Sequence, residues 1–239
     1  MTIIIDGTNG ISGVDGTAAN PAVEGTDANT GLFYPAADTV ALATNGSERM
    51  RVDSSGYMQG TVNGLGAGRI PAVQYYRLNS DLAGANVNTV QSVFGVGVTL
   101  IGSMQYAFEA SYVFTKTAGA TSHTFAIGFG GTATINNILY QGNNNYTAST
   151  IPFGLNGGGY TFATNSTASL VVSTAITSAT EFVQLNFKGT ISINAGGTII
   201  PQYTLSAAPG GAYSTATGSY FAIWPLAASG SNVSIGTWA

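Results

Sequence analysis

Residues Tyr106 to Gly131 read YAFEASYVFTKTAGATSHTFAIGFGG, and this stretch alternates between apolar and polar side chains. Glu109 and Ser111 fall on one side of an extended chain. The large aromatic residues of the first half fall on the other side: Tyr106, Phe108, Tyr112 and Phe114. Because successive side chains of a strand point to opposite faces, this pattern is typical of antiparallel strands that bury one face.

The same alternation recurs on both sides of this stretch. Residues Val183 to Ile193 place apolar side chains at odd-numbered positions and polar ones between them. Further candidate strands occupy residues 73–78, 96–100, 135–140, 160–163, 170–173, 199–205, 219–226 and 233–235. About ten short strands, joined by turns of Gly, Asn, Ser and Thr, predict an all-β fold built as an antiparallel β-sandwich. Only residues 82–90 have a pattern that could hold a helical turn.

Charged residues are scarce, at 7% of the 239 residues against roughly 25% in typical soluble proteins. A net charge of -4 provides no basic field for nucleic acid or an anionic membrane. With no cysteine and one histidine, disulfides and thiolate sites are excluded and a zinc site is not expected. We expect no cofactor and no metal. The start MTIIIDGTNG lacks the pattern of a secretion signal, and no apolar run is long enough to anchor the chain in a bilayer.

The distribution of charge predicts a domain boundary. Of the 16 charged residues, 12 lie at or before Asp81, and the remainder of the chain carries only Glu109, Lys116, Glu181 and Lys188. The Gly-rich segment 60–68 reads as a hinge between the two parts. We therefore expect an N-terminal segment over residues 1–68 and a head domain over residues 69–239.

A short repeat occupies the first 26 residues. Three copies of a β-branched residue, an acid, Gly and Thr recur every nine residues, with the acids at Asp6, Asp15 and Glu24. The acid–Gly steps favour turns, and a calcium ladder is the alternative, although the paired glycines of calcium-binding nonapeptide repeats are missing. So few repeats cannot bury a core alone. We expect partner chains or another protein to cover them.

Residues 32–53 read as short strands, LFYP, TVALAT and ERMRVD, with a hairpin turn at Asn45-Gly46. Met50 and Val52 alternate with charged side chains, so one face is apolar and the other carries both signs. Two interpretations of the charged face remain open. It is either an ordinary solvated face or a docking surface on which four side chains pair across subunits: Glu48, Arg49, Arg51 and Asp53.

The stretch Thr26 to Gly56, TDANTGLFYPAADTVALATNGSERMRVDSSG, resembles a module of bacteriophage tail-fibre and other virion appendage proteins. The elements that carry the resemblance are Asn29-Thr30-Gly31, Phe33 to Thr39, and Asn45 to Gly56, present in the same order. The resemblance implies a virion component that attaches to the particle through this segment, made in the host bacterial cytoplasm. The attachment candidates are Asp6, Asp15, Glu24, Arg49 and Arg51.

The head resembles the compact jelly roll of phage tail proteins, which is related to the tumour-necrosis-factor and complement-C1q type. The matching stretches are Tyr106 to Gly131, Phe187 to Gly211 and Gly218 to Leu226; the Asn-rich segment 141–150, expected to be a loop, has no counterpart. The resemblance implies a homotrimer. Residues 220–226 are apolar on both faces, so one face needs a cover beyond the domain's own core. The candidates for this subunit interface are Tyr220, Phe221, Ile223 and Trp224.

Catalysis is weighed because many phage fibres resemble glycan-cleaving enzymes. A glycosidase needs two carboxyl groups roughly 5 to 9.5 Å apart. The head offers Glu109 and Glu181, and the alternating pattern places both on polar strand faces. His123 is either a strand-edge residue on the Phe125 face or a general base, but no acid near it in sequence could orient it. We expect no enzymatic activity and no catalytic residues.

Host-surface binding is the more plausible activity, since Asn, Tyr and Gly side chains and turns suit a glycan or protein receptor. The candidates are Asn143, Asn144, Asn145, Tyr146 and Tyr160, and an ordinary polar turn is the alternative. The expected function is a trimeric fibre or appendage of a phage tail, collar or head. A capsid decoration or cement protein that clamps the shell is the alternative, and a glycan-cleaving tailspike is a third possibility.

Overall fold

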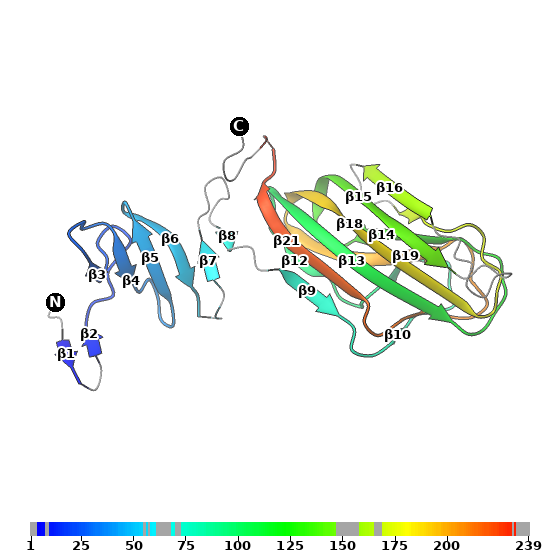
Figure 1. Ribbon diagram of the computed structural model, residues 1–239, viewed down its shortest axis with the longest axis horizontal. Coiled ribbons are helices and arrows are strands. Elements are labelled where there is room, and N and C mark those ends of the chain that lie inside the picture. Colours follow the sequence, from blue (N-terminus) through cyan, green and yellow to red (C-terminus); the bar gives the residue numbers. More distant parts are fainter. Residues whose placement is uncertain are drawn as a thin grey trace. The chain divides into compact units, whose positions relative to one another are not determined.

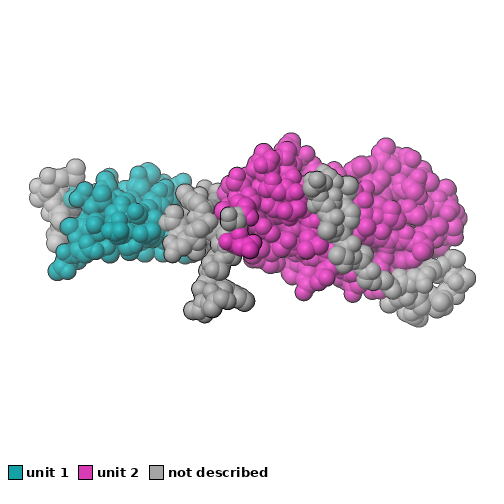
Figure 2. All heavy atoms as spheres, turned by 90° about the horizontal axis from the view of Figure 1, so that it is seen from above, with its two compact units in different colours: residues 1–72, 233–239 teal, residues 73–232 magenta. Residues whose placement is uncertain are grey.

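The computed structural model of the protein describes residues 4–7, 10–54, 56, 58–60, 68–69, 73–146, 158–164, 169–230 and 232. These residues form antiparallel strands and turns and include no helix, which confirms the predicted all-β class. The chain divides into two compact units, residues 1–72 with 233–239, and residues 73–232 (Figure 2). The second unit is called the head below.

The head is a sandwich of two antiparallel sheets (Figure 1). The larger sheet runs in the order β9 (Gln74–Arg77), β21 (Tyr220–Ala228), β13 (Met104–Lys116), β18 (Glu181–Ala195), β15 (Thr134–Tyr146) and β16 (Gly158–Thr164). The short strands β10 (Leu82–Ala83) and β20 (Ser214–Thr215) extend it beside β13. The smaller sheet contains β11 (Gln91–Ser92), β12 (Val98–Leu100), β19 (Gly197–Leu205), β14 (Phe125–Gly130) and β17 (Leu170–Val171).

The strand order is that of a jelly roll. Strands β9, β21, β13 and β18 lie side by side in one sheet, and β12, β19, β14 and β17 lie side by side in the other. The chain passes repeatedly from one sheet to the other, so each sheet is assembled from strands distant in sequence. The hairpin β15–β16 is an addition that pairs with the free side of β18.

The predicted alternation accounts for the head's core. Along β13 the even-numbered side chains point inward, and Phe108 is 1% exposed. Its ring lies 5.6 Å from the ring of Phe129 in the other sheet and 5.7 Å from that of Phe221. Between the two sheets, the ring of Phe114 in β13 lies 4.7 Å from that of Phe125 in β14. The apolar faces of the two sheets therefore cover each other.

Two local predictions for the head were wrong. Residues 82–90 contain the strand β10 and turns in place of a helical turn, because Leu82 and Ala83 pair with β20. Residues 141–146 belong to strand β15 and not to a loop, because β18 and β16 pair with this segment on either side. Residues 147–150 and the predicted strand at 233–235 lie outside the described residues.

The N-terminal unit is an antiparallel meander of six strands. They are β3 (Val23–Glu24), β4 (Gly31–Phe33), β5 (Val40–Thr44), β6 (Ser47–Val52), β7 (Met58–Gly60) and β8 (Gly68–Arg69). A separate hairpin joins β1 (Ile4–Asp6) and β2 (Gly10–Ser12). Gly60 and Gly68 of the predicted hinge pair across β7 and β8, and residues 61–67 between them lie outside the described residues.

The fibre-module residues form the turns of this meander. Asn45 and Gly46 have φ values of 53° and 67°, which build the predicted hairpin between β5 and β6. The Asn-Thr-Gly turn holds this hairpin: Gly46 N donates to Asn29 O at 2.9 Å, and Asn45 N donates to Thr30 Oγ1 at 3.3 Å. Thr30 Oγ1 in turn donates to Asp27 Oδ2 at 2.8 Å. Two motif elements 15 residues apart thus form one hydrogen-bonded unit.

Candidate functional site

One face of the N-terminal meander is apolar and exposed. Cross-strand partners share a face, and the register aligns Val23 with Leu32, Leu32 with Leu42, Leu42 with Met50, Val40 with Val52, and Val52 with Met58. The exposed fractions are 48% for Val23, 41% for Leu42 and 49% for Met58. We call these seven residues the open face: Val23, Leu32, Val40, Leu42, Met50, Val52 and Met58.

The opposite face of the meander is covered by the chain itself. Phe33, Ala41 and Ala43 are buried there, and Ala18 packs against them. The loop that carries Ala18 is tied down by the hydrogen bond from Tyr34 N to Asp15 O at 2.8 Å. Three buried side chains, two of them alanines, make a very small core for six strands.

Two charged residues lie on this covered side, Glu48 opposite Ala43 and Arg51 opposite Ala41. Arg51 forms a two-pronged ion pair with Glu48 of the same strand. The Glu48 carboxylate, by this hydrogen bond, raises the pKa of the Arg51 guanidinium. Arg49 is the extra residue of a bulge and donates to Thr44 Oγ1 at 2.9 Å. The predicted docking surface therefore contains an ion pair made within the chain.

The three repeat acids occupy different settings. Asp6 ends strand β1, Asp15 is exposed in the loop before the bridge between Gly16 and Pro21, and Glu24 is exposed in the edge strand β3. The nine-residue period therefore does not correspond to a repeated structural unit. Among the described residues, no three His, Cys, Asp or Glu side chains gather in a way that could hold a metal ion.

The predicted receptor residues do not form one surface. Asn144 is 7% exposed and donates through Nδ2 to Val172 O, and Tyr146 is 5% exposed with its hydroxyl 2.8 Å from Thr174 Oγ1. Both side chains face the interior because β15 continues through them. Asn143 is exposed and Asn145 half-buried on the outer side, and the backbone of Tyr160 pairs with Gly142.

The predicted subunit strand β21 divides its side chains between two sides. Phe221 and Ile223 are 5% and 1% exposed and belong to the head's own core. Tyr220 and Trp224 are half-buried on the outer side, where the Tyr220 ring lies 5.7 Å from that of Tyr75. Only the outer pair is placed to meet another subunit.

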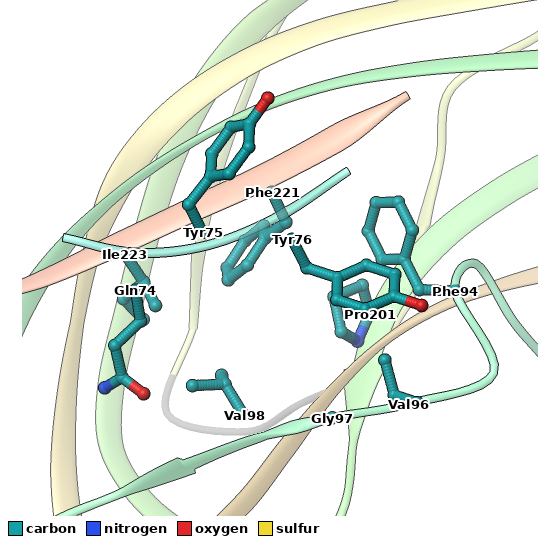
Figure 3. A pocket seen from close by; sticks show the side chains of 10 residues that line it. All are labelled: Gln74, Tyr75, Tyr76, Phe94, Val96, Gly97, Val98, Pro201, Phe221 and Ile223. Carbon is teal, nitrogen blue, oxygen red and sulfur yellow. The ribbon is translucent and has the colours of Figure 1, made fainter. Parts of the chain in front are cut away.

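A cleft of about 170 Å³ opens between the edges of the two sheets (Figure 3). Tyr76 of β9 and Phe94 approach each other across it, with ring centroids 5.6 Å apart. Gln74 supplies an amide at one side. The remaining lining is apolar or aromatic: Tyr75, Val96, Gly97, Val98, Pro201, Phe221 and Ile223.

A buried polar cluster at one end of the sandwich was missed by the sequence reasoning. Lys116, His123 and Glu181 are each 2% exposed, and Tyr213 is fully buried. Lys116 Nζ donates to Gly119 O at 2.5 Å and to Ser178 O at 2.8 Å. The His123 ring lies between Thr121 O, 2.7 Å from Nδ1, and the Tyr213 hydroxyl, 2.8 Å from Nε2. Because a carbonyl can only accept, Nδ1 carries the proton of the neutral ring.

Burial shifts the titration of this cluster. Loss of hydration raises the pKa of Glu181 to about 7, against the opposing effects of the Ser178 N–H and the Lys116 charge. The same loss of hydration lowers the pKa of His123 and of Lys116. Glu181 Oε1 accepts from Ser178 N at 2.9 Å, whereas Oε2 has no hydrogen-bond partner.

Glu109 and Glu181 cannot act as a glycosidase pair. Glu109 is exposed on the outer face of the larger sheet, and Glu181 is buried on the inner face, which corrects its predicted polar position. In the register Glu181 is opposite Lys116, seven residues from Glu109, which corresponds to about 24 Å along the strand. His123 does lie on the Phe125 face, but its ring is enclosed by protein.

Comparisons with known proteins add little beyond the fold. No protein-family model matches the chain, and no curated protein is similar to it in sequence. The solved structure of Eiger TNF from S. frugiperda is 10% identical over 69% of this chain and 98% of that chain, with a TM-score of 0.27. A VP2 subviral particle of infectious bursal disease virus is 7% identical over 80% of this chain and 50% of that chain, with a TM-score of 0.19. Likenesses at this level carry no argument about function, so the jelly roll rests on the strand order itself.

Within the described part of the chain, no helix is long and apolar enough to cross a membrane.

Proposed function

We propose that the protein is a non-enzymatic structural component of a bacteriophage virion, a trimeric fibre or appendage of the tail, collar or head. The N-terminal unit attaches it to the particle, and the head contacts the host surface. The observation that carries this proposal is the structural role of the fibre-module residues. Asn29, Thr30, Asn45 and Gly46 tie two turns of one small sheet together, and that sheet leaves its open face for a partner.

The head supports a binding role in preference to a catalytic one. Its buried polar cluster is enclosed by protein, and its outer sheet face carries polar and charged side chains in neighbouring strands, with Gln141 opposite Lys188 and Lys188 opposite Glu109. Asn143 and Asn145 are the candidate receptor residues that remain on this face. A glycan or protein of the host surface is the expected partner.

Antibody against the head, applied to intact particles and located by electron microscopy, tests the proposal. Label on the tail, neck or a projecting fibre is the expected result. Uniform label over the shell would assign the chain as a capsid decoration protein, and absence from particles would reject a virion role. Glycan cleavage that Glu109→Gln abolishes would reject the non-enzymatic assignment.

A further inference from the structure

The N-terminal meander has an apolar surface too large to belong to a self-sufficient sheet. The open face crosses five strands, which at a spacing of about 4.8 Å makes it about 19 Å wide. Its seven side chains are Val, Leu and Met, and none is charged. Contiguous apolar patches on this scale mark interaction sites on otherwise soluble proteins.

We propose that the open face packs against the open faces of other copies of this chain. This proposal rests on the proposed function in one respect: it takes the chain to be part of an assembly. The sequence suggested the charged face as one possible contact between subunits. The proposal instead assigns the contact between N-terminal units to the apolar open face.

Charge is the first argument for this occupant. Two open faces meet without bringing like charges together, although the unit is acidic as a whole. Arg51, which stands between Met50 and Val52 in the sequence, points to the covered face and pairs there with Glu48. Nothing on the open face therefore requires a charged partner, and a face of the same chemistry is a complete match.

Folding is the second argument. Among the described residues, the hydrophobic cluster of this unit contains only Phe33, Ala41 and Ala43, so the meander gains little from its own core and needs its cover at the time it folds. Most soluble oligomers are homo-oligomers, which favours copies of the same chain as this cover. Among the described residues, the apolar sheet faces of the head are not available as this cover, because they bury each other.

The absence of cysteine makes a direct test possible with the full-length chain. Leu42→Cys places one thiol on the open face, and Leu139→Cys places one on the outer face of the head at a similar exposure, 48% against 41%. A short bis-maleimide added to the folded protein is expected to convert most of the Leu42→Cys chain into covalent dimers, the largest product that one thiol per chain allows. The Leu139→Cys control is expected to stay monomeric on a denaturing gel.

Leu42→Asp provides a second readout, with Leu139→Asp as its control. Because Leu42 is exposed within one chain, the proposal expects Leu42→Asp to raise the dissociation constant measured by analytical ultracentrifugation at least tenfold, with no change for Leu139→Asp. Multimers that form equally well in both Asp variants, or a Leu42→Cys chain that reacts with a monofunctional maleimide but never cross-links, overturn the proposal. A monomeric chain that still labels on particles would overturn this contact and leave the virion assignment standing.

Discussion

The head and the N-terminal unit use the same alternation of apolar and polar residues, but they differ in what covers the apolar side. In the head, two sheets face each other, and the Phe108 ring contacts rings from both of them. In the N-terminal unit a single sheet has a core of three buried side chains, while Leu42 and Met58 remain more than 40% exposed. The pattern in a strand therefore shows that a face is apolar, and the fold decides whether the chain itself covers it.

The largest effect is expected in the head. Phe108→Ala removes a ring that is 1% exposed, and such changes cost about 3–5 kcal/mol of unfolding free energy. Denaturant unfolding followed by circular dichroism would measure it. Leu139→Ala, on the outer face of the same sheet, is the control and should cost much less. A loss below about 1 kcal/mol for Phe108→Ala would mean that the head's core is not the source of its stability.

The buried cluster gives the stability of the head a pH dependence. The folded-state pKa of Glu181, about 7, lies above its ordinary value of 4.5, so folding favours the neutral carboxyl. This contribution is full below pH 4.5 and is lost as the pH rises through 7, a change of about 3 kcal/mol.

Glu181→Gln keeps the shape of the side chain and removes the titration. We expect the stability of the variant to fall less than that of the unchanged protein between pH 4.5 and pH 7.5, as measured by urea unfolding at each pH. His123 acts in the opposite direction, since burial lowers its pKa and its contribution is lost as the pH falls. Parallel profiles for the two proteins would contradict the burial of an unpaired carboxyl oxygen.

The hairpin of the N-terminal unit tests whether its turns hold the sheet. Gly46 has φ of 67°, and an alanine there is expected to cost about 1–2 kcal/mol because its Cβ disfavours the left-handed conformation. Gly25 is the matched control, since its φ is not in that region and nothing lies within 4 Å of a Cβ added there. Gly46→Ala should lower the thermal midpoint of the N-terminal unit, whereas Gly25→Ala should leave it unchanged or raise it. Equal midpoints for the two variants would show that this turn does not stabilise the sheet.

The smallest expected effect separates a core role of the Asn-rich strand from a receptor role. Tyr146→Phe deletes a hydroxyl bonded to Thr174 and should cost about 1 kcal/mol of stability. Host adsorption of particles that carry the variant should not change, because the side chain is buried. Asn143→Ala, on the outer face, is the companion variant for adsorption. Loss of adsorption with Tyr146→Phe and unchanged stability would return Tyr146 to the receptor surface.

Much of the head could be predicted from the sequence because period-two alternation persists along its strands. The buried cluster was also within reach of that pattern. Lys116 continues the inward series of Tyr112 and Phe114, and Glu181 continues that of Val183 and Leu185. The missing step was to extend each strand by one pair of residues. Charged side chains seldom lie in a core, so the sequence predicts inward series that stop at Phe114 and at Val183, one pair of residues short of Lys116 and Glu181.

Other features depend on pairing that no local pattern encodes. Residues 141–146 contain three consecutive Asn, which favour turns, and they form a strand only because β18 and β16 bond to both sides of it. In the N-terminal unit, the bulge between Leu42 and Ala43 moves Glu48 opposite Ala43 and makes Arg49 the extra residue. The sequence predicted an apolar and a charged face correctly, but the small cover over the charged face comes from the distant loop that carries Ala18.

Hydrogen–deuterium exchange of the full-length protein at several concentrations tests the central difference between the two units most directly. The account predicts that amides of β5 and β6 lose protection on dilution, because copies of the chain separate and the open face is uncovered. Amides of β13 and β18 should keep their protection at every concentration, because the head covers its own core. Protection of β5 and β6 that does not change with dilution would show that the N-terminal sheet is stable alone and would contradict the account.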